Sequence, residues 1–596
     1  MTWPSARAKA AWPLAALLLL TLLAYSGSFG GAFQFDDQRS IVDNPVIRDL
    51  RNFLPGGEGY HQRPNRSVAY LTFALNHRAG GLAPAGYHAV NLAIHLLNGL
   101  LVLALVRLAF RTPRLAGSAL APRASEIAAV AALLFATHPL QTQAVTYVVQ
   151  RITSLATTFC LLTLVLYLRW RLAPSGPSRR PARAAGYLLL LLTAALAMRT
   201  KEIAFTFPLV IALFDLYLLD GPWTTRLAAL APLVACMGII PATVLSTAGA
   251  AADFGDVQRL TRVQTSLGRL DYLATELPVM ATYLRLLVLP LGQNLDHDFP
   301  LFHSFLAAPV AASALLLGSL VAFGCWLLLA RTRPGPRPLD PAARLVALGI
   351  AWFFLALLLE SSVIPIVDVI FEHRAYLPSV GFFLAVSAGG GLLARRLGDA
   401  RGRVLFLGAG LALAAGLSAA TYARNEVWAT PLSLWADAAA KSPGKSRPQN
   451  NLGAALDAAG RDDEALPHVL AAIRLDPGNA EAHYNLGRIR LVQGDYAGAL
   501  DSLQTAVALQ PAQPEAWANL AAVLNRLRRF DETVRLVGDG ARIDGSADGH
   551  FNLGVALAAL GDDDAARREI RLLEDRAPAL ARNLAAYLEG LRGSPR

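Results

Sequence analysis

Two neighbouring carboxylates follow the first apolar stretch of the chain. They are Asp36 and Asp37, in the run Phe35-Asp36-Asp37-Gln38-Arg39. A carboxylate pair where the chain leaves a membrane can act as a general base, or hold a divalent cation beside a phosphate. A solvated loop with an Asx turn at Asp43-Asn44-Pro45 accounts for the same residues equally well. The pair therefore predicts chemistry only in combination with other ionisable groups.

Four further segments place polar or ionisable side chains at the ends of apolar stretches. Lysine and arginine suit a phosphate, whereas carboxylate and imidazole groups suit acid–base work. Each segment taken alone is explained as well by an interfacial salt bridge or polar cluster. Together they predict an active site if the fold brings them to one face of a membrane. The segments are His138-Pro139-Leu140-Gln141, Arg199-Thr200-Lys201-Glu202, Asn294-Leu295-Asp296-His297-Asp298-Phe299-Pro300 and Phe371-Glu372-His373-Arg374, and the loop after residue 29 adds Arg63.

Apolar stretches must position these residues, and they dominate the composition. Hydrophobic residues make up 54% of the 596 residues and charged residues only 16%, against roughly 25% charged in an ordinary globular protein. Eleven stretches have about the length that crosses a bilayer. The first follows basic residues and resembles a signal peptide, but it is predicted to be a retained span. The stretches lie near 11–29, 88–110, 125–146, 152–170, 184–199, 203–219, 227–247, 305–330, 344–360, 376–394 and 403–421.

The distribution of charge predicts which loops face the cytoplasm. With the N-terminus inside, the arginine-rich loops around 107–123, 169–183 and 331–344 fall on the inner side. Acids such as Asp36 and Glu372 fall on the outer side, so the pattern follows the positive-inside rule. An odd number of crossings then places everything after residue 421 outside.

One further stretch, 271–290, is predicted to be an interfacial or re-entrant loop. It contains Glu276, Pro278 and Arg285, each of which is costly or helix-breaking at bilayer depth. Counting it as a twelfth crossing would also move the later arginine-rich loops to the outer side. Eleven crossings are therefore predicted.

Net charge and cysteine content exclude two other classes of protein. The net charge of +11 lies mostly in short arginine-rich stretches between apolar spans, which membrane topology explains better than nucleic-acid binding does. Cys160, Cys236 and Cys325 stand inside apolar runs without Cys-x-x-Cys or Cys/His spacing. Neither a disulfide framework nor a zinc site is predicted.

The C-terminal quarter repeats at a fixed period. Asn-Leu-Gly or Asn-Leu-Ala recurs at 451–453, 485–487, 519–521 and 552–554, a spacing of about 34 residues that is typical of tetratricopeptide helical hairpins. Twelve residues beyond each third position stand small residues that let paired helices approach, namely Ala465, Ala499, Thr533 and Ala566. Such arrays usually present a groove to a peptide or protein, and a docking module without chemistry is the plainer interpretation of the array alone.

The motifs together resemble the transmembrane and tetratricopeptide repeat-containing family of protein O-mannosyltransferases, within the C-type glycosyltransferase superfamily. The resemblance rests on Phe35-Asp36-Asp37, His138-Pro139-Leu140-Gln141, Lys201-Glu202, the run 295–300, Glu372-His373-Arg374 and the trailing repeats. It implies an all-α fold with a polytopic, C-type glycosyltransferase-like helical bundle of about eleven spans and a tetratricopeptide solenoid. The implied domains are 1–424 for the bundle, 425–445 for a linker, 446–580 for four repeats and 581–596 for a capping tail.

The resemblance also implies a reaction. A hexose, by analogy mannose, would pass from a polyprenyl-phosphate carrier to a serine or threonine hydroxyl of an acceptor protein held by the repeats. Asp36 or Asp37 would be the base, with the choice between them open. The donor phosphate would be bound by Arg374, His373, Lys201 and Arg63. Supporting polar residues would be Glu202, His138, Glu372, Asp296, His297 and Asp298. The resemblance implies no particular cofactor, and a divalent cation is compatible with the acids.

The arginine-rich composition indicates a GC-rich bacterium, so the predicted location is the inner membrane with the repeats in the periplasm. Two alternatives remain at this point. One is a membrane scaffold without catalysis that recruits proteins through its repeats. The other is a different lipid-linked-glycan enzyme, such as a ligase or polymerase.

Overall fold

The chain folds into helices that form two compact units. The computed structural model describes residues 6–54, 56–59, 64–174, 176–248, 267–329 and 339–593. All regular elements within those ranges are helices, which confirms the predicted all-α class. The units are residues 1–433, called here the membrane unit, and residues 434–596, called the repeat unit.

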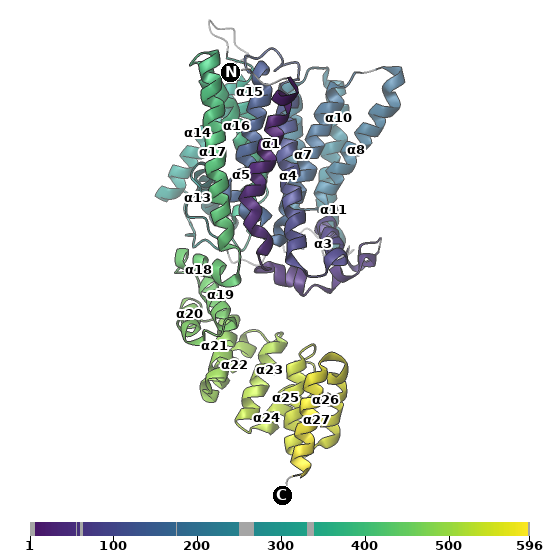
Figure 1. Cartoon of the computed structure of the whole chain (residues 1–596), viewed down its shortest axis with the longest axis vertical. Helices are drawn as coiled ribbons and strands as arrows, with labels where there is room; N and C mark the ends of the chain where they lie inside the picture. The colour runs from purple at the N-terminus through teal and green to yellow at the C-terminus, as the bar shows by residue number, and fades with distance from the viewer. Residues whose placement is uncertain are drawn as a thin grey trace. The chain divides into compact units, whose positions relative to one another are not determined.

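The membrane unit is a bundle in which α1, α4, α5 and α7 run side by side (Figure 1). Its helices of eight or more residues within the described ranges are α1 (Ala6–Tyr25), α3 (Ser67–Gly80), α4 (Pro84–Ala109), α5 (Ala124–Thr137), α7 (Arg151–Leu172), α8 (Arg180–Met198), α9 (Phe207–Leu218), α10 (Trp223–Ala235), α11 (Ile239–Ala248), α13 (Arg269–Val288), α14 (Ala308–Leu329), α15 (Ala343–Leu357), α16 (Tyr376–Arg395) and α17 (Asp399–Val427). Residues 425–445, predicted as a linker, hold the end of α17 and all of α18 (Pro431–Lys441).

Eight helical segments of the described chain are long and apolar enough to cross a membrane, so the protein is a multi-pass integral membrane protein. Three of the eleven predicted crossings, 125–146, 203–219 and 344–360, correspond to the shorter helices α5, α9 and α15. Helix α5 ends early because His138 precedes a proline and adopts an extended conformation, as the residue before proline prefers. The number of eleven crossings is therefore not confirmed.

The interpretation of 271–290 as a loop was wrong. These residues form α13, a helix of 20 residues with Pro278 in its interior. Glu276 and Pro278, which argued against a crossing, are buried in the protein rather than exposed to lipid. Helix α13 is not among the eight helical segments long and apolar enough to cross a membrane, so only the expectation of a loop is corrected. An acid that would be costly against lipid is tolerated when it points into the protein.

Close packing of α15 on α16 shapes the part of the bundle next to α13. A Cβ atom on Gly349 of α15 would come within 2.3 Å of the Gly381 carbonyl oxygen of α16. Only the absence of a side chain lets the two backbones approach this closely. Helices α13 and α14 also pack together, and α14 packs on α15.

The repeat unit stacks helical hairpins in sequence order. The hairpins are α19 (Ser446–Ala458) with α20 (Asp462–Leu475), α21 (Ala480–Gln493) with α22 (Tyr496–Leu509), α23 (Pro514–Arg526) with α24 (Phe530–Val537), and α25 (Ala547–Leu560) with α26 (Asp563–Arg576), followed by α27 (Pro578–Gly593). The four small residues predicted at the helix contacts, listed above, are fully buried. Each hairpin thus covers an apolar face that it could not bury alone.

Candidate active site

The acid pair after the first span lies in a turn that is closed by two hydrogen bonds between Gln34 and Asp37. The Asp37 N–H donates to the Gln34 carbonyl oxygen at 2.8 Å, and the Gln34 N–H donates to Asp37 Oδ2 at 2.9 Å. Phe35 and Asp36 form the tip of this turn, and Phe35 adopts a φ of +46°. Positive φ is costly for an aromatic residue and is often found at functional sites. The turn therefore holds Asp36 in one orientation at the expense of local strain.

The two acids of the turn have opposite environments. Asp36 is exposed, and its N–H donates to the Tyr147 hydroxyl at 2.9 Å. Asp37 is fully buried, and its Oδ1 accepts from the Val149 N–H at 2.7 Å. Burial raises the pKa of Asp37 to about 7, although hydrogen bonds from the backbone of Gln34 and Val149 act in the opposite direction. Asp37 anchors the turn, whereas Asp36 is exposed and its carboxylate is hydrogen-bonded to the Tyr147 side chain.

The beginning of α7 joins this turn to the next group of ionisable residues. Val149, just before α7, holds Asp37, and Thr153 in its first turn accepts a hydrogen bond from Lys201 Nζ at 3.0 Å. Between them, Arg151 is fully buried and donates to Asn91 Oδ1 at 2.6 Å and to the Tyr87 carbonyl oxygen at 3.0 Å. Four residues of helix rise only about 6 Å, so the first-loop acid and Lys201 are tethered to neighbouring turns.

Lys201 and Arg66 each face a carboxylate. Lys201 Nζ lies 3.4 Å from Glu360 Oε1, and both side chains are largely buried. The Arg66 guanidinium meets both carboxylate oxygens of Glu202 at 3.3 Å. Burial lowers the pKa of the Lys201 ammonium, and the charge of Glu360 acts in the opposite direction. These two ion pairs form a compact group in which each cation is balanced by a carboxylate. We call this group, with the residues that join it below, the cationic cluster.

Arg374 completes the cationic cluster. It lies in η13 (Glu372–Ala375), just before α16, and donates to the carbonyl oxygens of Asp368 at 2.8 Å and Val369 at 3.0 Å. The charges of Arg374, Lys201 and Glu360 lie close enough to interact, and buried Glu276 of α13 interacts with Arg374 as well. Fixed cations of this kind stabilise negative charge that develops on a leaving phosphate.

The remaining predicted polar residues form a supporting network around the start of α16. Glu372 Oε1 lies 3.0 Å from His297 Nε2 and accepts from the Asn294 N–H at 2.6 Å. The His373 N–H donates to Gln143 Oε1 at 2.6 Å. These contacts attach the loop after α13 and the segment after α5 to η13, the short helix that carries Arg374. These residues position the cationic cluster rather than extend it.

Four further predicted residues are His138, Asp296 and Asp298, which lie near this network, and Arg63, which lies outside the described residues. His138 is buried, and its Nε2 contacts the Leu287 carbonyl oxygen at 3.2 Å. Asp296 is buried and Asp298 is exposed in the loop after α13. Within the described ranges, no group of three or more His, Cys, Asp or Glu side chains is arranged to hold a metal ion.

Sequence reasoning did not assign three residues that complete the cationic cluster. Glu360, which pairs with Lys201, follows the end of α15. It was counted as the end of an apolar stretch and was not considered as a site residue. Glu276 was read only as an obstacle to a crossing. Arg66 stood in the first loop beside Arg63 without a distinguishing pattern. An acid inside an apolar segment was the available signal, because such residues are commonly functional.

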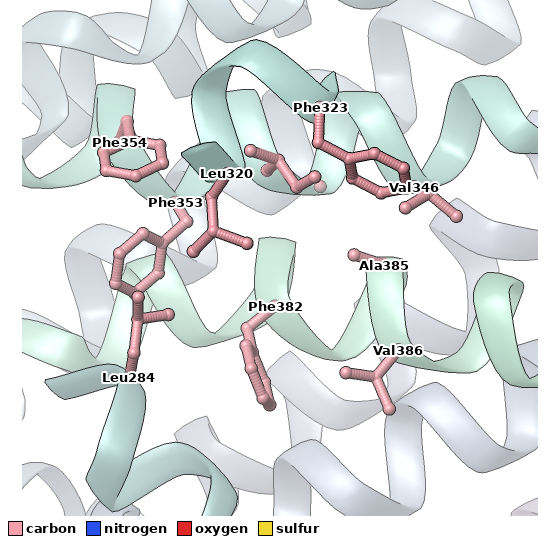
Figure 2. Close-up of a pocket in the computed structure, with 11 residues that line it drawn as sticks. Leu284, Leu320, Phe323, Val346, Phe353, Phe354, Phe382, Ala385 and Val386 are labelled. Carbon is pink, nitrogen blue, oxygen red and sulfur yellow. The ribbon is translucent and has the colours of Figure 1, made fainter. Parts of the chain in front are cut away.

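An apolar cavity of about 250 Å³ lies between α13, α14, α15 and α16. Phe323, Phe353 and Phe382 stand around it, and the sticks drawn in Figure 2 contain only carbon. Phe354 on α15 and Leu284 on α13 also line it. Leu284 lies eight residues from Glu276 along α13, a rise of about 12 Å, so α13 carries both a wall of the cavity and an acid beside Arg374.

Comparison with known proteins supports both units. A family model described as Tetratricopeptide repeat matches residues 450–514 and 484–543, which confirms the predicted repeats. The protein O-mannosyl-transferase Tmtc3 of Drosophila melanogaster is 27% identical over 523 residues, covering 76% of this chain and 54% of that protein. The protein O-mannosyl-transferase Tmtc2 of the same species is 36% identical over 211 residues, covering 33% of this chain and 21% of that protein.

Among solved structures, an oligosaccharyltransferase of Archaeoglobus fulgidus aligns at 15% identity with a TM-score of 0.36, covering 77% of this chain and 59% of that one. A likeness of that extent does not establish a shared fold. The chain spans about half of the length of the fly relative Tmtc3 and less of the others named here. The predicted resemblance to the transmembrane and tetratricopeptide repeat-containing proteins is confirmed by these matches: a multi-pass membrane unit and tetratricopeptide repeats stand in one chain that is similar to curated protein O-mannosyl-transferases.

Proposed function

We propose that the protein is a membrane glycosyltransferase that moves a hexose from a polyprenyl-phosphate carrier to serine or threonine hydroxyls of acceptor proteins. Its relatives Tmtc3 and Tmtc2 are named protein O-mannosyl-transferases, which makes mannose the first candidate sugar. The observation that carries the proposal is the difference in burial between the two acids. Asp37 is buried and hydrogen-bonded within the turn, whereas Asp36 is exposed at its tip.

Asp36 is the proposed general base. Its carboxylate takes the proton of the acceptor hydroxyl while the oxygen attacks the anomeric carbon of the donor sugar. The new carbon–oxygen bond forms as the bond from that carbon to the lipid phosphate breaks, and the phosphate oxygen keeps the electron pair. The proton remains on Asp36. This displacement changes no oxidation state and so needs no oxidant or reductant.

Lys201, Arg66 and Arg374 are the proposed phosphate-binding groups. Their positive charges are already balanced by Glu360, Glu202 and Glu276, so the donor enters a site of nearly neutral charge. As the lipid phosphate gains charge, the fixed cations stabilise it without reorganisation. His373 is proposed to assist from the adjoining position.

The apolar cavity of Figure 2 supports a lipid-linked donor. Its lining residues are all apolar, which suits an isoprenoid chain and not a sugar nucleotide. Of the helices that line it, α13 carries Glu276, α15 ends shortly before Glu360, and α16 begins shortly after Arg374. We propose that the first isoprene units lie there while the phosphate reaches the cationic cluster.

The acceptor side is proposed to be extracytoplasmic, with the repeat unit in the periplasm of a bacterium. The positive-inside pattern supports this orientation. A phosphatase reporter fused after Arg596 tests it, because such a reporter is active only outside the cytoplasm. Reporter activity is expected, and an inactive, cytoplasmic fusion would overturn the orientation.

Transfer by purified protein tests the base. Full-length protein in lipid nanodiscs receives radiolabelled polyprenyl-phosphate mannose and serine- or threonine-containing acceptor proteins, and GDP-mannose replaces the lipid donor in a parallel reaction. Asp36→Asn is expected to lower the rate at least about a hundredfold, whereas Asp43→Asn, an exposed acid of the same loop, is expected to leave it unchanged. Full activity of Asp36→Asn contradicts the proposed base, and no transfer by the wild type leaves the scaffold interpretation in its place.

The lipid donor has its own test. Ala385→Phe fills the apolar cavity, so it is expected to raise KM for the polyprenyl donor severalfold with a smaller change in kcat. Ala409→Phe is the matched control, because Ala409 lines a neighbouring apolar pocket that shares only Val386 with the first and includes none of the helices α13 to α15. Equal KM values for the two variants would remove the support for a lipid chain in this cavity.

A further inference from the structure

A broad groove on the repeat unit combines apolar, amide and cationic side chains. Its volume is about 1020 Å³, several times that of the apolar cavity in the membrane unit. Its walls come from the ends of α21 and α23, the first residues of α22 and α24, and from α25 and α27. Helices α21, α23, α25 and α27 pack against one another in order, so the groove runs from the second repeat to the last helix.

The lining of the groove suits an extended polypeptide. Tyr496, Phe530, Phe551 and Tyr587 offer aromatic surface for apolar side chains, and Tyr587 is 36% exposed. The Asn525 amide donates to the Asn552 carbonyl oxygen and accepts from the Thr533 hydroxyl, and the Asn552 amide donates to the Ala518 carbonyl oxygen. Asn583 is exposed in the lining, and its amide can donate to a peptide carbonyl oxygen and accept from a peptide N–H.

Two arginines give the groove a positive charge. Arg526 and Arg528 line it and are exposed, and no aspartate or glutamate is among its lining residues. The next arginine along the chain, Arg529, is instead paired with Glu532 at 2.5 Å. The groove thus presents two guanidinium groups without a lining acid to balance them.

Arg528 occupies a position where the other repeats use glycine. The turn between the two helices of a repeat has a left-handed residue, which is Gly460, Gly494 and Gly561 in the first, second and fourth repeats, with φ of +72°, +81° and +84°. In the third repeat that residue is Arg528, with φ of +60°. Glycine adopts this conformation without steric cost, whereas a side chain with a Cβ is strained there.

The strain at Arg528 points to a role in binding. Three repeats show that glycine closes this turn, so the hairpin itself does not require arginine. A strained residue that persists where an unstrained one would suffice is expected where its side chain is used. The side chain of Arg528 faces the groove beside Arg526.

We propose that this groove binds an extended acidic peptide segment of a partner protein, in which carboxylate side chains alternate with apolar or aromatic ones. Arg526 and Arg528 bind the carboxylates through charge-assisted hydrogen bonds, and Asn583 binds the backbone. The aromatic residues cover the apolar side chains. Binding of such a segment is independent of sugar transfer, so it extends beyond the proposed function.

Peptide binding by the full-length protein tests this inference. Fluorescein-labelled ten-residue peptides are titrated with protein in nanodiscs of neutral lipid, and fluorescence anisotropy reports the dissociation constant. One peptide alternates glutamate with leucine and tyrosine, and a second carries glutamine in place of every glutamate. The acidic peptide is expected to bind at least about tenfold more tightly, with an affinity that falls as salt concentration rises. Equal affinity for the two peptides would overturn the proposal.

Variants of Arg528 separate binding from folding. Arg528→Gly is expected to weaken binding of the acidic peptide about tenfold while raising the unfolding temperature, since glycine relieves the positive φ. Arg528→Lys should retain most of the affinity, and Arg567→Gln, an exposed arginine of α26 outside the groove, should retain all of it. A purely structural role for Arg528 predicts the opposite effect of Arg528→Gly on stability. Unchanged binding by Arg528→Gly, or capture of anionic vesicles in preference to the peptide, overturns the inference.

Discussion

Phe35 in the membrane unit and Arg528 in the repeat unit are the two residues other than glycine that adopt positive φ in the described part of the chain. Each lies at the candidate site of its own unit, the first beside Asp36 and the second in the groove. Phe35 is held by a turn that buried hydrogen bonds close twice, whereas Arg528 occupies an ordinary turn that glycine closes elsewhere. Strain thus serves two purposes here: it orients a neighbouring acid in one unit and presents the strained side chain itself in the other.

The two regions also differ in how their cations are balanced. Lys201 and Arg66 of the membrane unit face Glu360 and Glu202, because an unpaired charge inside the bundle would be costly. The groove of the repeat unit is open to water, so its arginines need no lining acid. A buried site must carry its own counter-ions, and an open site can leave them to the ligand.

The largest predicted effect concerns the buried pair of Lys201 and Glu360. Lys201→Met should reduce sugar transfer at least about a hundredfold and also lower the unfolding temperature, because Glu360 is left buried without its partner. The double variant Lys201→Met/Glu360→Gln should recover the unfolding temperature but not the activity. Thermal unfolding followed by fluorescence and the radiolabel assay measure the two properties. Recovery of transfer in the double variant would show that the lysine serves only the fold.

The next effect concerns the strained turn. Phe35→Gly should leave Asp36 in place but release its orientation, so kcat is expected to fall about tenfold while the unfolding temperature stays the same or rises. The transfer assay and thermal unfolding again give both values. An unchanged kcat would mean that strain at Phe35 contributes nothing to the proposed site, and the comparison with Arg528 would no longer hold.

The third prediction concerns pH. Burial raises the pKa of Asp37 to about 7, so between about pH 4 and pH 7 the folded protein holds a proton that the unfolded chain releases. The contribution of this group to the free energy of unfolding is fully present below about pH 4 and is lost as the pH rises through about 7. The unfolding temperature of the wild type, measured relative to Asp37→Asn, should therefore fall from pH 5 to pH 8 by several degrees.

Asp43→Asn is the control for that series. Asp43 is exposed in the same loop, so the wild type measured relative to this variant should show no comparable trend. A difference between wild type and Asp37→Asn that stays constant with pH would contradict a buried, proton-holding Asp37.

The smallest predicted effect tests the cost of arginine in a repeat turn. Gly561→Arg in the fourth repeat should lower the stability of the repeat unit by about 1 kcal/mol, because an arginine would have to adopt the φ of +84°. Urea denaturation of the full-length protein, followed by tryptophan fluorescence, measures the change. A variant as stable as the wild type would show that the left-handed turn tolerates side chains, and Arg528 would then need no functional explanation.

Much of the architecture could be predicted from local sequence. The repeat period, the small residues at helix contacts and the apolar character of the membrane unit depend on neighbours along the chain. The errors arose where a contact partner lies far away in sequence. Glu276 favoured a loop only if its surroundings were lipid. In the structure Glu276 is buried in the protein, so the segment can form the helix α13.

The sequence alone determined that the chain holds apolar membrane helices, an array of tetratricopeptide hairpins and a pair of acids after the first span, since residue type and spacing are sufficient for each. Only the tertiary structure decided that Asp37 is buried and Asp36 exposed, because the Val149 N–H that fixes Asp37 lies 112 residues away. It likewise decided that Glu360 is the partner of Lys201 and that Arg528 faces the groove. The direction of a side chain follows from long-range packing, and the spacing of residues in the sequence does not record it.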